Sequence, residues 1–506
     1  MQDGTLLAAV DLGSNSFRLE IGRHALGHIE RVSYTKEMVR QGAGLDEQKR
    51  LTPEAMQRGW ECLARFGERL QGFPAQHVRA VATQTLREAV NRDEFLSRGS
   101  EVLGYPISVI SGPEEARLIY QGAAYSLPPS DEKRLVVDIG GRSTELILGQ
   151  GYHTRQVASF PVGSVSWSLR YFPDGAFSRA SLQTAQIAAQ AVLEEALNGF
   201  PRSSWDTAYG TSGTANAIAE VLHAHGEPDG LIRREGLQWL CEQLLAAQNA
   251  ANLRLPGLKE DRRAVVGGGV AALCAIFELL QIPEMRIADG ALRQGALRDM
   301  VQHQEHHDAR RVTIGALMQR FAADAPQAQR VQATAARLYE QAKRYVGITD
   351  PLQLRAPLLE WACELHEIGC LISHNDSHHH GAYVLQHSDI AGFTQSELTH
   401  MSALVLGQRG KLRKVEAYLG DNEFALQLLS LRLAVLLCHA RREPDFRSLQ
   451  LRAKPDKWSL RASPDWAEQH PQSAYLLNEE VQQWARTARV FQFKVAQPKL
   501  EAAGAR

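Results

Sequence analysis

The sequence predicts an α/β protein in its first part, followed by an all-helical region and a small α+β region. A twelve-residue phrase occurs twice, as DLGSNSFRLEIG over 11–22 and as DIGGRSTELILG over 138–149, and each copy lies between two strand-like apolar runs. Over about the first 300 residues, strand-like and helix-like patterns alternate, which is typical of mostly parallel sheets with covering helices. From 312 to about 443, nearly all apolar residues follow helical spacing.

Four strand–turn–helix patterns accompany the two copies of the phrase. They are VRAVATQTLREA (78–89), PISVISGPEEARLIYQGAA (106–124), TAYGTSGTANAIAEVL (207–222) and MRIADGALRQGALRDM (285–300). Near the end of the chain, we expect a hairpin around Pro455-Asp456 and a strand over 488–496.

The changes in pattern indicate several domains, as the length of 506 residues also requires. We place the domains at 1–125, 126–302, 303–445 and 446–506. The Pro-rich stretch SLPPSDEK (126–133) separates the first two, and the polar stretch HQEHHDARR (303–311) is expected to be a linker.

Charge and cysteine usage exclude several classes of protein. The chain has 56 Lys and Arg against 57 Asp and Glu, so global charge predicts neither a nucleic-acid nor a membrane partner. No apolar run is long enough to span a bilayer, and we see no signal peptide. The six cysteines are scattered and none lies in a CxxC motif, which fits free thiols in a reducing compartment. We therefore expect a cytoplasmic protein, with peripheral membrane association left open.

The repeated phrase indicates two half-sites that face one phosphate-containing ligand. The matched pairs are Asp11 with Asp138, Gly13 with Gly140, Ser16 with Ser143, Leu19 with Leu146 and Gly22 with Gly149. Small residues let backbone N–H groups approach a phosphate closely, and an Asp beside a phosphate commonly holds a cation. The alternative is a pair of hairpins whose sequences match by accident.

Gly, Ser and Thr recur where predicted strands end, which supports a polyphosphate-type ligand. From these turns we expect phosphate to be bound by Gly13, Ser14, Asn15, Ser16, Gly140, Gly141, Ser143, Gly213 and Thr214. Asp289-Gly290 forms a fourth such turn. The chain has no GxxxxGK[ST] and no GxGxxG opening a helix, which excludes a Walker-type site and a dinucleotide fold. Arg87 follows a strand end and is a candidate phosphate clamp, although a salt-bridged Arg is the commoner arrangement.

The segment SGPEEARL (111–118) contains the candidate general base. Ser111 is expected to cap a helix, and Glu114 lies where a capping box places its Glu. Glu115 lies about 100° further round the helix and is free to orient and deprotonate a water. The alternative, in which both glutamates only favour the helix dipole, is not decided by spacing.

The helical region carries histidines and a basic cluster. Its LHEIG segment (365–369) pairs His366 with Glu367, where a metal-dependent HD domain needs His-Asp, so we expect a scaffold without a metal. The cluster of Arg409, Lys411, Arg413 and Lys414 contains no acid. It suits either a solvated face or the path of a long polyanion.

Together, DLGSNSF, ATQTLREA, SGPEEARLIYQG, DIGGRSTE, GTSGT and ADGALRQG resemble the exopolyphosphatase/guanosine pentaphosphate phosphatase family. That family belongs to the superfamily of actin, sugar kinases and heat-shock chaperones. The likeness covers nearly the whole chain and looks strongest to the long proteobacterial exopolyphosphatases. It implies two actin-like (ribonuclease H-like) domains, then an all-α degenerate HD-like domain and a small α+β C-terminal domain.

The resemblance also implies roles for individual residues. Glu115 is the implied catalytic residue, and Mg²⁺ would be held by Asp138 and Glu145 with Asp11; a need for K⁺ stays open. The basic cluster is the implied polyphosphate path, and the family implies a homodimer. The third glycine of the family's DIGGGSTE phrase is Arg142 here, which either reaches a phosphate or points to solvent.

We interpret the chain as a processive exopolyphosphatase that releases orthophosphate from inorganic polyphosphate. The alternative is hydrolysis of the 5′-terminal phosphate of guanosine pentaphosphate, alone or as a second activity. A kinase would need an adenosine pocket and an acceptor-activating Asp, and we identify neither. A non-catalytic binder is disfavoured by the set of Glu115, Asp138 and Glu145.

Overall fold

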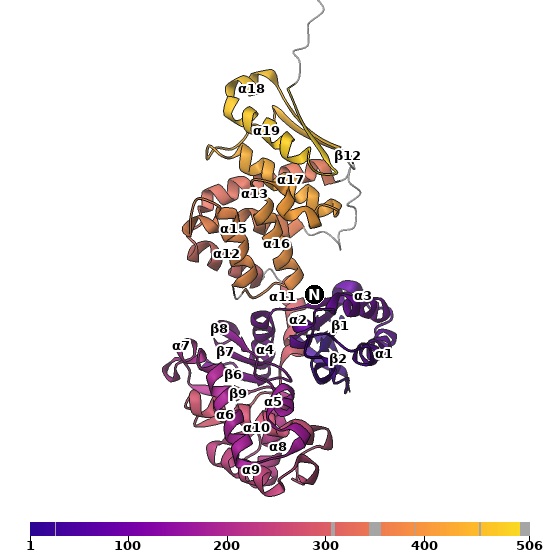
Figure 1. The fold of residues 1–506 in the computed structure, drawn as a ribbon, viewed down its shortest axis with the longest axis vertical. Coiled ribbons are helices and arrows are strands. Elements are labelled where there is room, and N and C mark those ends of the chain that lie inside the picture. The colour runs from indigo at the N-terminus through magenta and orange to yellow at the C-terminus, as the bar shows by residue number, and fades with distance from the viewer. Residues whose placement is uncertain (26, 305–308, 344–355, 389, 455–456, 496–506) are drawn as a thin grey trace, which may run out of the picture. The chain divides into compact units, whose positions relative to one another are not determined.

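The computed structural model describes residues 1–495 except 26, 305–308, 344–355, 389 and 455–456 (Figure 1). The chain divides into two compact units. The first comprises Met1–Asp308 with Asp389–Gln395, and the second comprises Ala309–Ser388 with Ser396–Arg506. None of the helices in the described part of the chain has the length and apolar character needed to cross a membrane.

The first sheet has five strands in the order β3-β2-β1-β4-β5. These are β1 (Leu6–Leu12), β2 (Phe17–Ala25), β3 (His28–Glu37), β4 (Val78–Ala82) and β5 (Ile107–Val109), accompanied by α1 (Pro53–Arg69), α2 (Gln84–Glu88), α3 (Arg92–Leu103) and α4 (Gly112–Ser126). β1 pairs antiparallel with β2 and parallel with β4. The predicted strand–turn–helix patterns over 78–89 and 106–124 form as β4–α2 and β5–α4.

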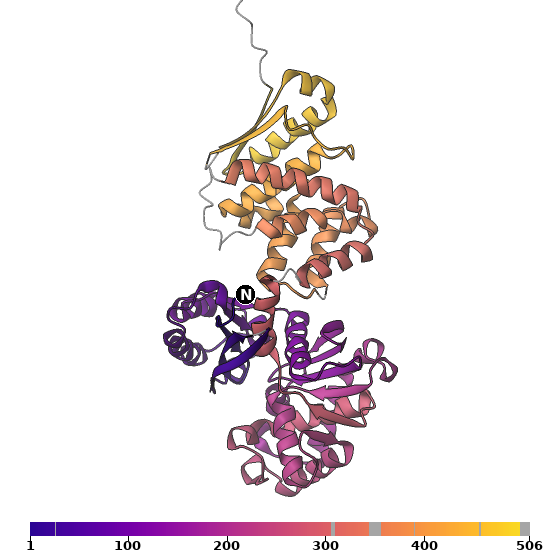
Figure 2. The ribbon, with the colours of Figure 1, turned by 180° about the vertical axis from the view of Figure 1, so that it is seen from behind.

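Alternation along β1 explains why this sheet is covered on both faces. Ala8, Val10 and Leu12 pack into the core with α1 and α3, which lie together beside the sheet (Figures 1 and 2). Leu7 and Ala9 point the other way, against helix α11 (Leu292–Gln304). A strand exposes successive side chains to opposite faces, so a run of apolar residues requires cover on both.

The second sheet has six strands in the order β10-β11-β9-β6-β7-β8. They are β6 (Lys133–Ile139), β7 (Thr144–Gln150), β8 (His153–Phe160), β9 (Thr207–Gly210), β10 (Leu231–Arg233) and β11 (Glu284–Ile287). The helices of this part, besides α11, are α5 (Ser164–Tyr171), α6 (Arg179–Leu193), α7 (Ala196–Gly199), α8 (Gly213–Ala224), α9 (Arg234–Ala247) and α10 (Val266–Leu279). The predicted patterns over 207–222 and 285–300 form as β9–α8 and β11–α11.

Helix α4 packs against residues of both sheets. Ile119 and Ala123 belong to one buried cluster with Val81 of β4 and Val136 of β6. Helix α11 lies close against α4, and a Cβ on Gly295 of α11 would lie 1.8 Å from the carbonyl oxygen of Leu118 in α4. No larger side chain fits that contact without moving the backbone. The middle of α4 is thereby held closely against α11.

The second unit is helical, with a three-stranded sheet near its end. It contains α12 (Ala309–Arg320), α13 (Ala325–Ala342), α14 (Ala356–Glu364), α15 (Ser377–His387), α16 (Gln395–Gly407, whose first residue belongs to the first unit), α17 (Asn422–Leu437), β12 (Leu449–Lys454), β13 (Lys457–Ala462), α18 (Pro464–Gln469), α19 (Pro471–Trp484) and β14 (Val490–Val495). β12 and β13 pair antiparallel as the predicted hairpin requires, while its turn at Pro455-Asp456 lies outside the described residues. β14 joins parallel to β13.

The predicted linker over 303–311 is wrong at both ends. Helix α11 runs to Gln304, and helix α12 begins at Ala309. Polar residues continue a helix readily where its face is exposed, so polarity alone was a poor guide here. The residues between the two helices lie outside the described part. The four-domain division itself stays a prediction.

Candidate active site

The two copies of the repeated phrase form equivalent hairpins. In the first, β1 turns through 13–16 into β2, and Asp11 lies opposite Arg18 across the strands. In the second, β6 turns through 140–143 into β7, and Asp138 lies opposite Glu145. The second turn closes with a hydrogen bond from Gly140 N to Ser143 O of 2.8 Å. Both turns therefore present small residues and backbone groups at the end of a central strand.

These turns line one cavity of about 380 Å³ in the first unit. Of the residues predicted to bind phosphate, the cavity is lined by Gly13, Ser14, Asn15, Ser16, Gly140, Gly141, Ser143, Gly213 and Thr214, and Asp11, Glu115, Asp138 and Asp289 also line it. Ser212 caps helix α8 by accepting hydrogen bonds from Thr214 N and Ala215 N, so the positive end of that helix faces the cavity. Arg87, Arg142 and Glu145 do not line it.

Glu115 lies in the first turn of α4, and its side chain reaches the wall of the cavity. The residue is 8% exposed, and its Oε2 accepts a hydrogen bond of 2.8 Å from Arg87 Nη1. Burial is the largest cause that raises the pKa of Glu115 to about 7. The negative charges of Asp138 and Asp11 add to the rise, and the positive charge of Arg87 opposes it. A carboxyl that titrates near neutral pH is suited to general-base catalysis.

Arg87 does not line the cavity and forms its hydrogen bonds with other protein groups. Its guanidinium donates to Glu115, to Gln84 Oε1 and to the Ile110 carbonyl oxygen at 2.9 Å. In this structure, Arg87 therefore pairs with Glu115. Its predicted role as a phosphate clamp stays a prediction. The salt-bridged Arg that the sequence offers as the alternative is the arrangement observed.

Asp138 and Glu145 form a buried acidic pair at the second hairpin. Thr211 Oγ1 donates to Asp138 Oδ2 at 2.7 Å, and Ser159 Oγ donates to Glu145 Oε1 at 2.8 Å. Glu145 is 0% exposed, and its Oε2 has no hydrogen-bond partner among the described residues. Burial raises the pKa of both carboxyls, and for Glu145 the charges of Glu115 and Asp138 add to the rise.

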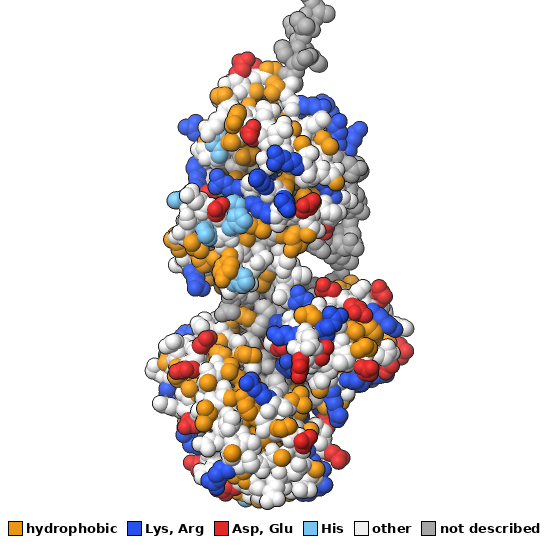
Figure 3. All heavy atoms as spheres, viewed as in Figure 1, with side chains coloured by type: hydrophobic (Ala, Val, Ile, Leu, Met, Phe, Trp, Pro, Cys, Tyr) orange, Lys and Arg blue, Asp and Glu red, His pale blue; other side chains and the backbone are white. Residues whose placement is uncertain are grey.

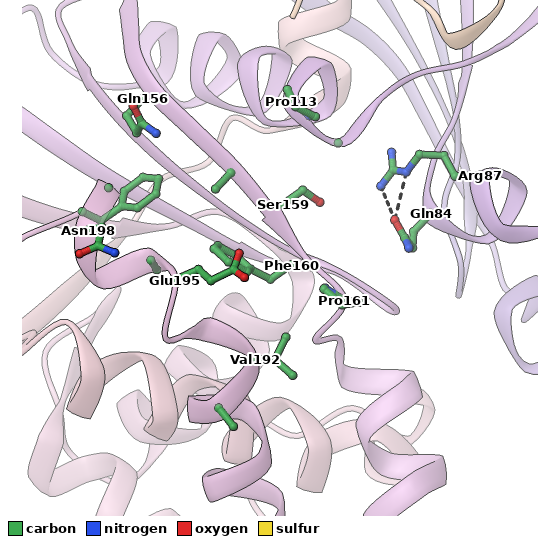
Figure 4. Close-up of a pocket in the computed structure, with 16 residues that line it drawn as sticks. Gln84, Arg87, Pro113, Gln156, Ser159, Phe160, Pro161, Val192, Glu195 and Asn198 are labelled. Atoms are coloured by element: carbon green, nitrogen blue, oxygen red, sulfur yellow. Dashed lines mark hydrogen bonds between the residues drawn. The ribbon is translucent and has the colours of Figure 1, made fainter. Parts of the chain in front are cut away.

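A second cavity, of about 1000 Å³, lies in the first unit. Arg87 and Ser159, which hold Glu115 and Glu145, both line it (Figure 4). Gln84 lies against Arg87 at one edge, and Glu195 lies across from Pro113. Arg87 and Ser159 thus form part of the wall of this second cavity, and each donates a hydrogen bond to one of the two glutamates.

Glu114 does not complete the predicted capping box. Ser111 Oγ accepts from Glu114 N at 3.2 Å as a helix cap does, but no reciprocal bond from the Glu114 carboxylate is formed. That carboxylate is fully buried and accepts from Arg117, Arg79 and the Gly392 N–H instead. Buried arginines compete for the carboxylate more strongly than the exposed end of a helix does.

Arg142 neither reaches the cavity nor points to solvent. Its Nη2 pairs with Glu88 at 2.9 Å, and its Nη1 donates to the Gly42 carbonyl oxygen at 3.2 Å. Its backbone has no positive φ, so the turn needs no glycine there. The side chain instead links the second hairpin to the first sheet's region.

Basic residues at the cavity were missed from the sequence. They are Arg18, Lys36, Lys259, Arg262 and Arg293. Arg18 and Arg293 pair with Asp11, and Lys36 pairs with Asp261. The Arg262 guanidinium lies against Gly213 at the start of α8, and no carboxylate of the described residues forms an ion pair with it. Arg18 lies inside the repeated phrase and could have been found there, whereas Arg262 has no local signal.

The predicted basic cluster belongs to the second unit. Its four residues follow α16, with Arg413 and Lys414 in the short 3-10 helix Leu412–Tyr418, and Lys414 Nζ donates to the Arg409 carbonyl oxygen at 2.6 Å. Burial and the charge of Arg432 lower the pKa of Lys414 to about 8. Figure 3 shows Lys, Arg and His side chains gathered on the visible face of this unit. A polyphosphate path along Arg409, Lys411, Arg413 and Lys414 stays a prediction.

Two histidines of the His-rich segment SHHHGAYVL (377–385), a pattern that also occurs in metal sites, form a group with Asp376. Ligand-type atoms of Asp376, His378 and His379 lie within 4.8 Å of one another. Burial and the charge of Lys414 lower the pKa of His378 to about 4. Since Lys414 is close enough to oppose a second cation, we do not assign a metal to this group. His366 is buried, with its Nδ1 2.7 Å from the Cys363 carbonyl oxygen.

Comparison with known proteins identifies the family. Residues 20–304 match the model of the Ppx/GppA phosphatase family, and residues 309–481 match the model of domain III of Ppx/GppA phosphatases. The chain belongs to the Ppx/GppA phosphatase family. It is therefore a phosphoric-anhydride hydrolase, with two actin-like domains followed by a helical domain III.

Two curated relatives named guanosine-5′-triphosphate,3′-diphosphate pyrophosphatase match nearly full length. One, from Vibrio vulnificus, is 40% identical over 472 residues, which cover 93% of this chain and 94% of the relative. The other, from Pseudoalteromonas translucida, is 39% identical over 484 residues, which cover 95% and 96%. The sequence motifs suggest the long exopolyphosphatases, whereas these relatives carry the name of the nucleotide hydrolase.

Solved structures share the fold over part of the chain. An exopolyphosphatase-like protein has a TM-score of 0.55 at 25% identity, covering 60% of this chain and 100% of its own. The Ppx/GppA family member of Aquifex aeolicus has a TM-score of 0.51 at 26% identity, covering 60% and 99%.

Proposed function

We propose that this Ppx/GppA phosphatase hydrolyses guanosine pentaphosphate, removing its 5′-terminal phosphate as orthophosphate. The observation that carries the proposal is the position of Glu115, a carboxyl with a pKa of about 7 on the wall of a cavity lined by glycine-rich turns. The near full-length relatives named for the same substrate support the choice of nucleotide.

The chemistry is an in-line displacement at the terminal phosphorus. Glu115 accepts a proton from water as the water oxygen bonds to phosphorus, and the bond from phosphorus to the bridging oxygen breaks. Residues of the turns at 13–16, 140–143 and 213–214 line the cavity, and we assign the binding of phosphate oxygens to backbone N–H groups of these turns. Such reactions depend mainly on positioning and on charge stabilisation.

The acidic pair fits a divalent cation. Asp138 and Glu145 are oxygen ligands of the kind Mg²⁺ prefers, and Glu145 Oε2 is buried without a partner among the described residues. Bound Mg²⁺ would neutralise charge on the phosphate. Asp11 lines the cavity with Asp138 but is already paired with two arginines, so we assign the cation to Asp138 and to Glu145, its neighbour across the strands.

The cations at the cavity support a ligand with more than one phosphate group. Arg18, Lys36 and Arg262 line the cavity together with the turns, and burial lowers the pKa of Arg262 and of Lys36. Guanosine pentaphosphate carries phosphates on both sides of its ribose, so one group can occupy the turns while another meets these cations.

Inorganic polyphosphate is the second candidate substrate. It is supported by the likeness to an exopolyphosphatase-like protein and by the acid-free basic cluster of the second unit. Both substrates require the same bond cleavage, so dual activity is compatible with one site.

The test is orthophosphate release with Mg²⁺ from guanosine pentaphosphate and from long-chain polyphosphate, measured in parallel. We expect release from the nucleotide, and a loss of about 10²–10⁴-fold in Glu115→Gln. Glu94→Gln is the control, because Glu94 is an exposed glutamate in the first turn of α3. Release from polyphosphate alone would reverse the choice of substrate, and an active Glu115→Gln would end the assignment of the base.

Quaternary structure is a separate prediction. We propose a homodimer, as the family resemblance implies, and light scattering on the purified protein tests it. A monomer at micromolar concentration would contradict it.

A further inference from the structure

A short segment far along the sequence belongs to the first unit. Residues 390–395 follow α15, and the last of them, Gln395, is the first residue of α16, yet all six belong to the first unit. Their contacts converge on the residues around Glu115.

One set of contacts fixes the N-terminus of α4. Gly392 N donates to Glu114 Oε2 at 2.6 Å, and Ser111 Oγ, the cap of the helix, donates to the Ile390 carbonyl oxygen at 3.3 Å. Glu114 is 1% exposed and directly precedes Glu115. Because neighbouring helical residues point about 100° apart, holding Glu114 sets the direction of Glu115.

Glu114 is also the centre of a buried charge network. Arg117 Nε donates to it at 2.8 Å and Arg79 Nη2 at 3.1 Å, and both arginines also pair with Asp299 of α11. Two arginines and one backbone N–H share this carboxylate, so little rotation of the first turn of α4 is possible. Segment 390–395 supplies one of these three donors, the backbone N–H of Gly392.

A second set of contacts reaches Glu115 through Arg87. Thr394 forms an antiparallel bridge with Ile110, just after β5, the edge strand of the first sheet. The Ile110 carbonyl oxygen accepts from Arg87 Nη1, the same atom that donates to Glu115 Oε2. Gln395 Oε1 accepts from Arg92 Nη1 at 2.9 Å, in the helix that follows Arg87.

We propose that segment 390–395 is a positioning element for Glu115, an inference that rests on the proposed role of Glu115 as base. It acts on both sides of the glutamate, through Glu114 and through Ile110 with Arg87. None of residues 390–395 lines the cavity, so the effect of the segment is on the orientation of the base.

The test uses Gly392→Ala. Gly392 has φ of +91°, where a side chain is strained, so Ala displaces its N–H from Glu114. We expect kcat to fall about tenfold, since small misplacements of catalytic groups are costly, with KM for guanosine pentaphosphate within about twofold. The matched control is Gly104→Ala, which has φ of +81° and open space around the added Cβ.

A double-mutant cycle separates positioning from general damage. In a Glu115→Gln background, Gly392→Ala should lower the residual kcat by less than about twofold, because its effect passes through the missing carboxylate. An equal loss in both backgrounds, or a loss no greater than that of Gly104→Ala, would overturn the proposal. If Gly392→Ala does not fold, Gln395→Ala is measured in the same cycle, with an expected loss of about threefold.

The outcomes distinguish this inference from the proposed function. Inactive Glu115→Gln beside an unaffected Gly392→Ala overturns the positioning role alone. Full activity of Glu115→Gln overturns the assignment of the base and the positioning role with it.

Discussion

Arg18 and Glu145 occupy the same position in the two repeated hairpins, with opposite charge. Arg18 lies across the strands from Asp11 and pairs with it at 3.4 Å, whereas Glu145 lies across from Asp138 and adds a second buried carboxylate. One hairpin therefore neutralises its aspartate from within the protein. The other leaves two acids whose raised pKa values a cation would relieve.

The first prediction concerns that cation. In the absence of substrate, Mg²⁺ should raise the melting temperature of the wild-type protein. A ligand that binds only the folded state raises the free energy of unfolding by about 2.7 kcal/mol when its concentration is 100 times its dissociation constant. Asp138→Asn and Glu145→Gln should lose most of this shift in differential scanning fluorimetry. Asp131→Asn, at an exposed position, is the control. A full shift in both acidic-pair variants would place the cation elsewhere.

The second prediction concerns the pH dependence of activity. Glu115 acts as a base in its deprotonated form, and its pKa is raised to about 7, so kcat/KM should rise with pH through that value. Measuring kcat/KM at pH values from 5.5 to 8.5 tests this rise. A profile that is flat across this range would contradict the pKa assigned to Glu115.

The third prediction uses the same pKa for stability. Between the usual carboxyl pKa and about 7, the folded protein holds a proton on Glu115 that the unfolded chain has lost. The free energy of unfolding contributed by this group is thus fully present at low pH and falls as pH rises through 7. Denaturant unfolding of wild-type and Glu115→Gln at several pH values should show the variant gaining relative stability as pH rises. A difference independent of pH would contradict this sign.

The fourth prediction concerns Arg142. Arg142→Gly should keep kcat/KM within about tenfold, because the side chain pairs with Glu88 and Gly42 and does not line the cavity. Steady-state kinetics beside Glu88→Gln, which removes the same ion pair, gives the comparison. A loss beyond about a hundredfold, roughly 2.7 kcal/mol, would show that Arg142 binds substrate.

The fifth prediction concerns Arg262. Arg262→Ala should raise KM for guanosine pentaphosphate about 10- to 100-fold, since hydrogen bonds to charged groups contribute about 1.5–3 kcal/mol. The change in kcat should be smaller. Arg263→Ala is a matched control, because Arg263 lies outside the cavity lining and pairs with Glu260. An unchanged KM would remove Arg262 from the substrate site.

Patterns that depend on neighbouring residues were predictable. Alternating strands and helices, the hairpin copies and the Ser111 cap all follow from local spacing, and the structure contains each of them. The predicted linker was wrong because the polarity of a segment does not by itself show whether the segment is helical. Residues 303–311 are polar, yet both described ends of that stretch are helical.

The sequence by itself determined the family, the α/β class and the small-residue turns, because those depend on residue type at short spacing. Only the tertiary structure decided what the charged side chains do. Arg87 holds Glu115, Arg142 pairs with Glu88, and Glu114 accepts from Gly392. A buried charge is costly to leave unpaired, so its partner is whichever opposite charge or N–H donor the fold brings near. Gly392 lies 278 residues from Glu114 in sequence.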